Sequence, residues 1–255
     1  MRGDSPASKR PANARVSQGA RRKGTRGSGE PDPHLVSLLE PGSFAADRYH
    51  MLRHLLELKR EEGSRVFAVT SPGAGDGKTT TVINIGGALA QDHAAQVLLV
   101  EADLRRPCMI ERLGMTGSRG GGVIPMVTRP GLPAADAIRA VPEFNLWLAP
   151  AGGSTATPYQ LLKSPRLWDF LTVARERFDY ILVDTPPILA SPDFKLIERW
   201  SDNTLLVVAA NRTPRQLVTE AAAQLDKEKA LGIVLNRESL LESRYYKYGK
   251  RDPQT

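Results

Sequence analysis

Five short runs of apolar residues recur along the chain, and each is apolar at nearly every position rather than at alternate positions. Strands with this pattern are buried on both faces, as in a parallel sheet that helices cover on both sides. A sixth run also predicts a strand. The predicted strands are Arg65–Thr70, Gln96–Val100, Phe144–Leu148, Tyr180–Val183, Thr204–Ala209 and Leu231–Leu235.

Amphipathic segments with helical spacing of apolar residues lie between these strands, and Ser43, Ser164 and Pro214 stand where helices begin. The predicted helices cover residues 43–62 and 78–91, run on from Pro165, and extend from Pro214 to about Lys227. The Gly- and Pro-rich segment Thr116–Pro133 predicts a loop. Strands that alternate with helices predict an α/β fold with a doubly wound, mostly parallel sheet.

The positive charge is concentrated at the N-terminus. The 255-residue chain has a formal net charge of +7, and residues 1–33 hold eight Lys or Arg against three Asp or Glu, so five of the seven charges lie there. This segment has almost no large apolar side chain, so residues 1–35 are predicted to be a disordered basic tail. It serves either as an electrostatic tether to anionic lipid or nucleic acid or as a solubilising extension.

The remaining composition bounds the class of protein. The single cysteine, Cys108, excludes a disulfide framework, an iron–sulfur cluster and a multi-thiolate zinc site, and it favours a reducing cytoplasm. No stretch of 18 mostly apolar residues is present, so we expect neither a membrane-spanning helix nor a secretory signal. We therefore expect one large domain over residues 36–240 between the basic tail and a short C-terminal tail, residues 241–255.

A phosphate-binding loop is predicted between the first strand and the helix that follows it. The sequence there is Gly73-Ala74-Gly75-Asp76-Gly77-Lys78-Thr79-Thr80. Small residues let backbone N–H groups converge on phosphate oxygens at the positive end of a helix. Lys78 is placed to reach the β- and γ-phosphates, and the Thr79 hydroxyl is placed to bind Mg²⁺.

Carboxylates stand at the ends of two other predicted strands. Glu101, Asp103 and Arg105 follow the second run, and Asp184 ends the run that begins at Tyr180. The carboxyl ends of parallel strands form one edge of a sheet, where nucleotides bind. Glu101, Asp103 and Asp184 are therefore candidate ligands of Mg²⁺ together with Thr79, and a carboxylate there can accept a hydroxyl proton. Together with the loop they predict a Mg-ATP site.

The C-terminal tail concentrates tyrosine. Tyr245, Tyr246 and Tyr248 are three of the six tyrosines, and they follow the last predicted strand in a polar, basic context. Beside an ATP site, exposed tyrosines are candidate phosphate acceptors, and each phosphate would add about −1.5 to −2 charge. The other interpretation is an exposed aromatic end without a role.

Together these residues resemble the bacterial tyrosine kinases of exopolysaccharide and capsule synthesis, P-loop proteins of the deviant-Walker type shared with MinD and ParA. The resemblance extends from about Asp47 to Tyr248. It is carried by the Gly73–Thr80 loop, Asp103-x-Arg105-x-Pro107, Phe178-Asp179-Tyr180 running into Val183-Asp184-Thr185-Pro186-Pro187, Pro158-x-x-Leu161-Leu162-x-Ser164-Pro165, Gly232-Ile233-Val234-Leu235-Asn236-Arg237 and the tyrosine cluster.

The resemblance implies a role for each matching residue. Lys78, Asp103, Arg105 and Asp184 would be catalytic, and Tyr245, Tyr246 and Tyr248 would be phosphorylated in trans by a neighbouring copy. The nucleotide would be held by residues 73–80 with Arg212 and Asn236. The second motif begins with Glu101, where the family usually has Asp.

The resemblance also implies partners. Asp47, His50 and Arg53 stand where the family has Glu-x-x-Arg-x-x-Arg, a helix pattern that contacts the next subunit of a ring formed by unphosphorylated copies. The protein would be the stand-alone cytoplasmic form, held at the inner face of the plasma membrane by a separate transmembrane chain-length determinant, a polysaccharide co-polymerase. A cognate tyrosine phosphatase would act on it, and no specific nucleic acid is implied.

Two alternatives remain open at this stage. A positioning ATPase of the MinD or ParA kind has the same fold and dimerises on ATP, but such proteins carry a lysine where this chain has Gly73. An ATP-bound switch that regulates polysaccharide export, with phosphotransfer weak or lost, is compatible with Glu101 and with the altered helix pattern.

Overall fold

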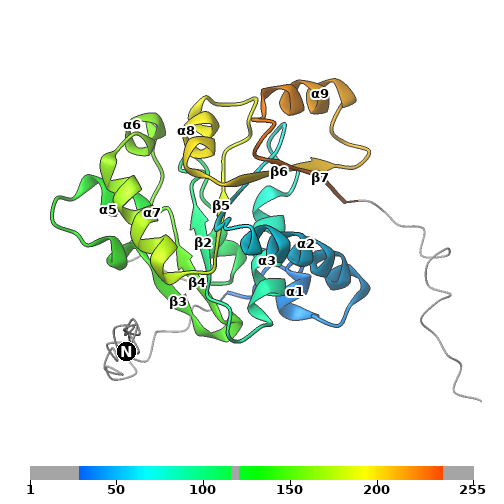
Figure 1. Ribbon diagram of the computed structural model, residues 1–255, viewed down its shortest axis with the longest axis horizontal. Helices are drawn as coiled ribbons and strands as arrows, with labels where there is room; N and C mark the ends of the chain where they lie inside the picture. Colours follow the sequence, from blue (N-terminus) through cyan, green and yellow to red (C-terminus); the bar gives the residue numbers. More distant parts are fainter. Residues whose placement is uncertain (1–28, 116–120, 238–255) are drawn as a thin grey trace, which may run out of the picture.

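The computed structural model describes residues 29–115 and 121–237, and they contain a seven-stranded sheet in the order β3-β4-β2-β5-β1-β6-β7 (Figure 1). Every neighbouring pair is parallel except β3 with β4. The strands are β1 (Val66–Thr70), β2 (Val97–Glu101), β3 (Arg139–Val141), β4 (Leu146–Ala149), β5 (Tyr180–Asp184), β6 (Asn203–Ala209) and β7 (Ala230–Asn236).

Helices cover both faces of this sheet. The α-helices are α1 (Val36–Leu39), α2 (Phe44–Glu61), α3 (Lys78–Ala90), α4 (Met109–Arg112), α5 (Val123–Thr128), α6 (Pro158–Leu162), α7 (Pro165–Arg177), α8 (Asp193–Trp200) and α9 (Arg215–Gln224). Two short 3₁₀ helices, η1 (Ala134–Ala137) and η2 (Pro142–Phe144), lie on either side of β3. Figure 1 shows α1 to α3 on one side of the sheet and α5 to α8 on the other.

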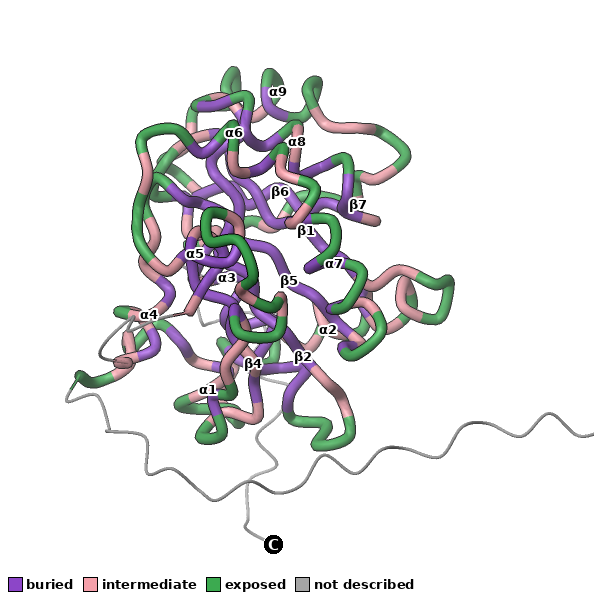
Figure 2. Tube along the Cα trace, turned by 90° about the vertical axis from the view of Figure 1, so that its left-hand side faces the viewer, coloured by how far each residue is buried: buried purple, intermediate pink, exposed green. Residues whose placement is uncertain are grey.

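Each face of the sheet has its own hydrophobic core. One core joins alternate residues of the strands to α5, α7 and α8, and Phe170 and Phe194 are fully buried in it. The other joins the intervening residues to α2 and α3, with Phe67 and Ile85 fully buried. Figure 2 accordingly shows the strands buried and the outer turns exposed. The doubly wound, mostly parallel fold predicted from the apolar runs is confirmed.

Local signals at helix ends act as the sequence predicts. The Ser43 hydroxyl oxygen accepts the N–H of Ala46 at 3.2 Å at the start of α2, and the Ser164 hydroxyl accepts the N–H of Arg166 at 3.3 Å at the start of α7. Such caps satisfy donors that have no partner inside the helix. The predicted helices are all present, and their ends differ from the predicted ends by a few residues.

The segment predicted as a loop, Thr116–Pro133, contains a helix in its described part. This helix, α5, places Val123 and Met126 in the core, where each is 1% exposed. Periodicity could not indicate it because the helix has only six residues and contains Pro125. The predicted strand Phe144–Leu148 begins two residues later, since η2 occupies Pro142–Phe144, and the antiparallel strand β3 was not predicted.

The boundary of the predicted N-terminal tail is corrected as well. Residues 29–35 were assigned to a disordered tail, yet Leu35 is fully buried and the Asp32 N–H donates to the Arg112 carbonyl at 2.8 Å. The charge count that defined the tail cannot detect one apolar anchor within a polar segment. Residues 1–28 lie outside the described part of the chain.

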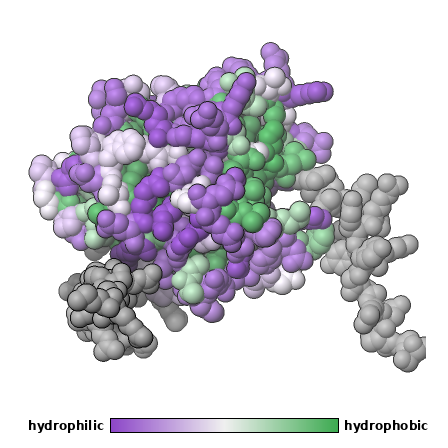
Figure 3. Space-filling view, in the orientation of Figure 1, coloured by the Kyte–Doolittle hydropathy of each residue, from purple (hydrophilic) through white to green (hydrophobic). Residues whose placement is uncertain are grey.

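The outer surface has two further features. Within the described residues, no helix has the length and apolar character needed to cross a bilayer. Figure 3 shows hydrophobic side chains gathered over β6 and β7, where Ile233 and Leu235 of the last strand are 56% and 54% exposed. The helix that follows β6, α9, therefore leaves part of this face of the sheet uncovered.

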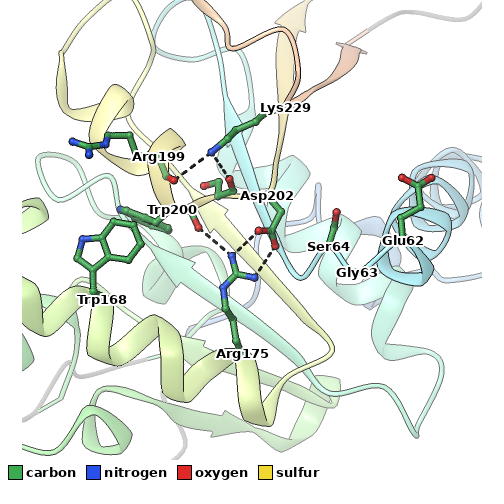
Figure 4. Close-up of a pocket in the computed structure, with 10 residues that line it drawn as sticks. Glu62, Gly63, Ser64, Trp168, Arg175, Arg199, Trp200, Asp202 and Lys229 are labelled. Atoms are coloured by element: carbon green, nitrogen blue, oxygen red, sulfur yellow. Dashed lines mark hydrogen bonds and ion pairs between the residues drawn. The ribbon is translucent and has the colours of Figure 1, made fainter.

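A pocket of about 490 Å³ lies at the amino-terminal edge of the sheet (Figure 4). Arg175 binds both carboxylate oxygens of Asp202, at 2.7 and 2.9 Å, and the same carboxylate accepts the N–H groups of Arg65 and Val66. Lys229 donates to three carbonyls at the C-terminal end of α8, those of Glu198, Arg199 and Ser201. We call Arg175, Asp202 and Lys229 the latch, because they join α7, α8 and β1 at this edge.

Candidate active site

The phosphate loop and the predicted acidic residues meet at the carboxyl edge of the sheet. A cavity of about 1230 Å³ opens there, beyond the ends of β1, β2 and β5. Its lining includes Ala74, Gly75, Gly77, Lys78, Thr79, Thr80, Asp103, Arg105, Arg106, Asn236 and Arg237. The topology explains this placement, since parallel strands present all their carboxyl ends on one side.

Glycine is required at two positions of the loop. Gly75 and Gly77 have φ angles of 87° and 96°, a region that residues with a side chain rarely adopt. A Cβ at Gly77 would also lie 2.0 Å from the Nδ2 atom of Asn236. The loop therefore keeps the open backbone that a phosphate group needs at the N-terminus of α3.

Asp76 has a different position from the one predicted. It is 4% exposed, its carboxylate accepts the Gly73 N–H at 3.1 Å and the Thr213 hydroxyl at 2.6 Å, and it does not line the cavity. The Asn236 side-chain amide donates to the Asp76 carbonyl at 2.9 Å. Asp76 therefore fixes the shape of the loop from within and does not face a ligand.

Three charged groups meet beside the cavity: Lys78 and Asp103 line it, and Asp184, which is 1% exposed, lies behind them. The Lys78 Nζ atom lies 2.9 Å from a carboxylate oxygen of Asp103 and 4.0 Å from one of Asp184. The Thr79 hydroxyl donates to Asp184 Oδ2 at 2.6 Å. We call Lys78, Asp103 and Asp184 the catalytic cluster. The structure thus joins residues that the sequence separates by up to 106 positions.

Burial dominates the electrostatics of Asp184. Desolvation, with smaller contributions from the charges of Asp103 and Glu101, raises the pKa of this carboxyl to about 6 against the opposing effects of Lys78 and of the Thr79 hydrogen bond. Its Oδ1 atom is buried and has no hydrogen-bond partner among the described residues. Burial lowers the pKa of Lys78, but Asp184 and Asp103 outweigh this effect and raise it overall.

These features fit magnesium and a polyphosphate. Mg²⁺ prefers oxygen ligands, and the site offers a buried carboxylate oxygen without a hydrogen-bond partner and an adjacent hydroxyl. One or two carboxylates suffice when phosphates and water complete the coordination shell of Mg²⁺. Within residues 29–115 and 121–237 no group of three or more His, Cys, Asp or Glu is arranged to bind a metal. Thr79 and Asp184 are therefore the residues that would hold the cation.

Glu101 is the predicted metal ligand that the structure places elsewhere. One carboxylate oxygen accepts the N–H groups of Cys108 and Met109, at 2.5 and 2.7 Å, and the other accepts the N–H of Ala151 at 3.0 Å. The side chain is 1% exposed and does not line the cavity. The alternation rule that grouped it with Asp103 fails because β2 ends at Glu101 itself. We therefore interpret Glu101 as a brace for the segment that follows β2.

Of the predicted arginine and amide residues, Arg105 and Asn236 line the cavity and Arg212 does not. Arg105 lines the cavity, and it is held by Asp193 at 3.1 Å and by the Ala156 carbonyl at 3.1 Å. Arg212 is exposed with its guanidinium against Gly75, but it does not line the cavity. Asn236 lines the cavity and braces the loop.

The predicted subunit-contact residues diverge. On α2, Asp47 is exposed and His50 is half-buried. Arg53 donates to Glu57 at 2.6 Å and to the Ala88 carbonyl at 3.0 Å, so its guanidinium is engaged within its own chain. The role of Asp47, His50 and Arg53 in contact with a neighbouring subunit stays a prediction. The acceptor residues Tyr245, Tyr246 and Tyr248 lie outside the described residues.

Sequence reasoning missed one wall of the cavity. This wall comes from the segment before α2, from α2 and from α4, and no spacing rule connects these segments. Tyr49 was assigned to a helix face, and its aromatic character gave no indication of an open cavity. The residues concerned are Asp32, His34, Val36, Tyr49, Cys108 and Arg112.

The chain is similar in sequence to named bacterial proteins. It is 31% identical to tyrosine-protein kinase CpsD of Streptococcus agalactiae over 85% of this chain and 95% of that protein. It is also 31% identical to the succinoglycan biosynthesis transport protein ExoP of Rhizobium meliloti, over 70% of this chain and 23% of that longer protein. No protein-family model matches the chain.

Solved structures give the same picture. The VpsO kinase domain has a TM-score of 0.68 and 28% identity, covering 80% of this chain and 96% of that one. The septum site-determining protein MinD of Pyrococcus horikoshii, complexed with Mg-ADP, has a TM-score of 0.57 and 22% identity over 69% of this chain and 71% of that one. The second likeness concerns the fold alone.

Proposed function

The chain belongs to the family of bacterial tyrosine-protein kinases of capsule and exopolysaccharide synthesis, and we propose that it transfers the γ-phosphoryl group of ATP to its own C-terminal tyrosines. The acceptors are Tyr245, Tyr246 and Tyr248 of a neighbouring copy. Each phosphorylation adds negative charge to a basic tail, and the change regulates polysaccharide polymerisation and export.

The observation that carries this proposal is the catalytic cluster beneath the phosphate loop. Lys78, Asp103 and Asp184 come from three separate segments; Lys78 lies within 4.0 Å of both carboxylates, and Lys78 and Asp103 line the cavity. A carboxylate that serves only in a structural ion pair is rarely buried with a raised pKa and with an oxygen that has no hydrogen-bond partner. Such an arrangement supports the proposal that the site binds a cation and phosphate.

Bound Mg-ATP supplies the transferable phosphoryl group and the cation that offsets its charge. The N–H groups of the loop would bind phosphate oxygens, and Thr79 and Asp184 would hold Mg²⁺. Lys78 is held by Asp103 at 2.9 Å, and when it turns towards phosphate it releases that carboxylate. Asp103 then accepts the proton of the acceptor hydroxyl, whose oxygen forms the new bond to phosphorus as ADP leaves.

The partners are proposed from the same family. A transmembrane polysaccharide co-polymerase would be the adaptor, and it would hold the kinase at the inner face of the plasma membrane. Unphosphorylated copies would form a ring in which α2 contacts the next subunit through Asp47, His50 and Arg53. A cognate tyrosine phosphatase would reverse the modification.

Incubation with ATP labelled at the γ-phosphate tests the reaction. We expect label on the tail tyrosines of the wild type, and none on Lys78→Met or on the variant with all three tyrosines changed to Phe. Lys195→Met is the matched control, because Lys195 also pairs with a buried carboxylate, Glu198 at 2.7 Å, but lies outside the cavity. Peptide mass mapping locates the label.

The other outcomes separate the alternatives. Equal labelling of the wild type and Lys78→Met contradicts the proposal. Bound ATP without any label, even with the cytosolic segment of a membrane partner, favours a regulatory switch. ATP hydrolysis without phosphotyrosine, stimulated by DNA or vesicles, favours a positioning ATPase.

A further inference from the structure

Residues 30–39, here called the strap, form one wall of the cavity before α2 begins. Asp32, His34 and Val36 line the cavity, and Leu35 between them is fully buried in the core shared with α2 and α3. Ser37 is 3% exposed. The strap therefore belongs both to the folded body and to the active site.

Buried Asn84 fixes the strap to the helix of the phosphate loop. Its side-chain oxygen accepts the Ser37 N–H at 2.9 Å, and its amide donates to the carbonyls of His34 and Thr80, each at 2.9 Å. A Cβ at Gly87 would lie 2.5 Å from a methyl carbon of Leu38. The strap is thus closely fitted to α3, and its position relative to the loop is set.

Arg112 of α4 joins the strap to the loop. Its carbonyl accepts the Asp32 N–H at 2.8 Å, and its guanidinium forms an ion pair with the Asp32 carboxylate. The same Nη1 atom donates to the Thr80 hydroxyl at 3.2 Å. Arg112 lines the cavity and its side chain is 35% exposed, so the guanidinium contacts the loop on one side and the open cavity on the other.

We propose that Arg112 is a phosphate-binding residue of the nucleotide site and that Asp32 is the residue that positions it. The inference rests on the proposed function, because the phosphates concerned are those of ATP. A guanidinium carries five N–H donors in a fixed plane, and both known contacts use Nη1. Donors therefore remain on a cation that the strap holds in a single orientation.

The electrostatic setting supports this role. Burial opposes the charge of Arg112, but the Cys108 thiol, Asp32 and Asp184 outweigh burial and raise its pKa, so the guanidinium stays charged. Lys78 reaches the cavity from the end of the loop, and Arg112 reaches it from α4. Two cations from separate elements match the several oxygens of a polyphosphate better than one.

The competing interpretation is that Arg112 only braces the wall. In that case its loss would disturb the whole cavity, and adenosine and Mg-ADP would be affected alike. Contact with phosphate predicts a different result, because only ligands that carry phosphate would bind more weakly. The difference between the two ligands therefore separates the roles.

Calorimetric titration of the full chain with Mg-ADP and with adenosine makes this measurement. We expect Arg112→Ala to weaken Mg-ADP binding at least about tenfold and to leave adenosine unchanged. Arg112→Lys keeps the positive charge but loses the planar guanidinium, so its Mg-ADP affinity should lie between those of the wild type and Arg112→Ala. Asp32→Asn weakens Mg-ADP about two- to fivefold and raises KM for ATP more than it lowers kcat.

Arg60→Ala is the matched control. Arg60 pairs with Asp179 across two elements, and its side chain is 32% exposed, close to the value for Arg112, but it does not line the cavity. It should leave both affinities unchanged. If Arg112→Ala does not fold, the comparison of Arg112→Lys and Asp32→Asn with Arg60→Ala replaces it.

Two results overturn the inference: unchanged Mg-ADP affinity in the Arg112 variants, or an equal loss for adenosine and Mg-ADP. Autophosphorylation of the wild type is measured alongside. Active wild type with unchanged Mg-ADP affinity in Arg112→Ala contradicts only the role of Arg112. If Arg112→Ala selectively loses Mg-ADP binding but the wild type never labels its tyrosines, the result contradicts only the proposed kinase activity.

Discussion

The catalytic cluster and the latch are two groups of charged residues at opposite edges of one sheet, the first buried and the second partly exposed. In the latch, the Asp202 carboxylate receives four hydrogen bonds, two from Arg175 and two from backbone N–H groups. In the catalytic cluster, Asp184 is more deeply buried, yet its Oδ1 atom has no hydrogen-bond partner among the described residues and only Lys78 at 4.0 Å as an ion-pair partner. The two aspartates also differ in the direction of their pKa shifts.

These opposite shifts have identifiable causes. Burial raises the pKa of Asp202, but the hydrogen bonds from Arg175, Arg65 and Val66 outweigh it and lower the pKa overall. Burial wins at Asp184 and raises its pKa to about 6. A carboxylate whose oxygens all have hydrogen-bond partners stabilises the fold. A buried carboxylate with an unpaired oxygen costs stability, and that oxygen is available to a ligand. We therefore expect the carboxyl edge to carry the proposed chemistry and the amino edge to hold elements together.

Asp184→Asn gives the largest expected effect. Phosphotransfer should fall at least about 100-fold, because the neutral amide holds Mg²⁺ poorly. The melting temperature without nucleotide or Mg²⁺ at pH 8 should rise by roughly 5 °C, because an unsatisfied buried charge is removed. Labelled ATP and differential scanning fluorimetry measure the two effects. A lower melting temperature at pH 8 would show that Asp184 is a structural charge.

Asp202→Asn should give the opposite pattern. The amide loses the charge that binds Arg175 and points an N–H₂ group at donors, so we expect a loss of about 2–4 kcal/mol in unfolding free energy. The melting temperature should fall by roughly 5–10 °C. Mg-ADP affinity, measured well below the transition, should not change.

Asp169→Asn is the control for this variant, because Asp169 is exposed on the same helix as Arg175. Its melting temperature should stay within about 1 °C of the wild type. Loss of nucleotide affinity in Asp202→Asn, at a temperature where the protein is folded, would contradict the separation of the two edges.

The pH dependence of stability separates the two carboxylates in the wild type. The folded pKa of Asp184 is raised, so the folded state takes up a proton between about pH 6 and pH 4 and stability rises as the pH falls through this window. The expected gain is about 3 kcal/mol, from a shift of about two pKa units. The lowered pKa of Asp202 acts at lower pH, where stability falls as that carboxyl is protonated.

Chemical denaturation at a series of pH values, without nucleotide or Mg²⁺, measures this profile. Asp184→Asn should abolish the rise between pH 6 and pH 4 and keep the fall at lower pH. Asp202→Asn should keep the rise and weaken the fall. A wild type whose stability falls steadily below pH 7 would contradict the raised pKa of Asp184.

The sequence predicted the catalytic cluster better than the latch for a physical reason. The loop around Lys78 and the acids after strands have fixed spacing relative to strand ends, and parallel topology brings those ends together. Arg175, Asp202 and Lys229 have no such spacing. The strap escaped prediction because its contacts with Asn84 and Arg112 depend on packing, and packing leaves no periodic signal in ten residues.

Glu101→Gln gives the smallest expected effect and tests the comparison most closely, because Glu101 lies at the catalytic edge but is saturated like Asp202. Its carboxylate accepts three backbone N–H groups. The amide would leave one donor unsatisfied, so we expect a loss of roughly 1–2 kcal/mol in unfolding free energy. The Mg²⁺ concentration that gives half-maximal phosphotransfer should change less than twofold, whereas a direct metal ligand would raise it at least about tenfold. A large change in Mg²⁺ dependence with unchanged stability would return Glu101 to the metal site and would show that hydrogen-bond saturation does not separate structural from catalytic carboxylates in this protein.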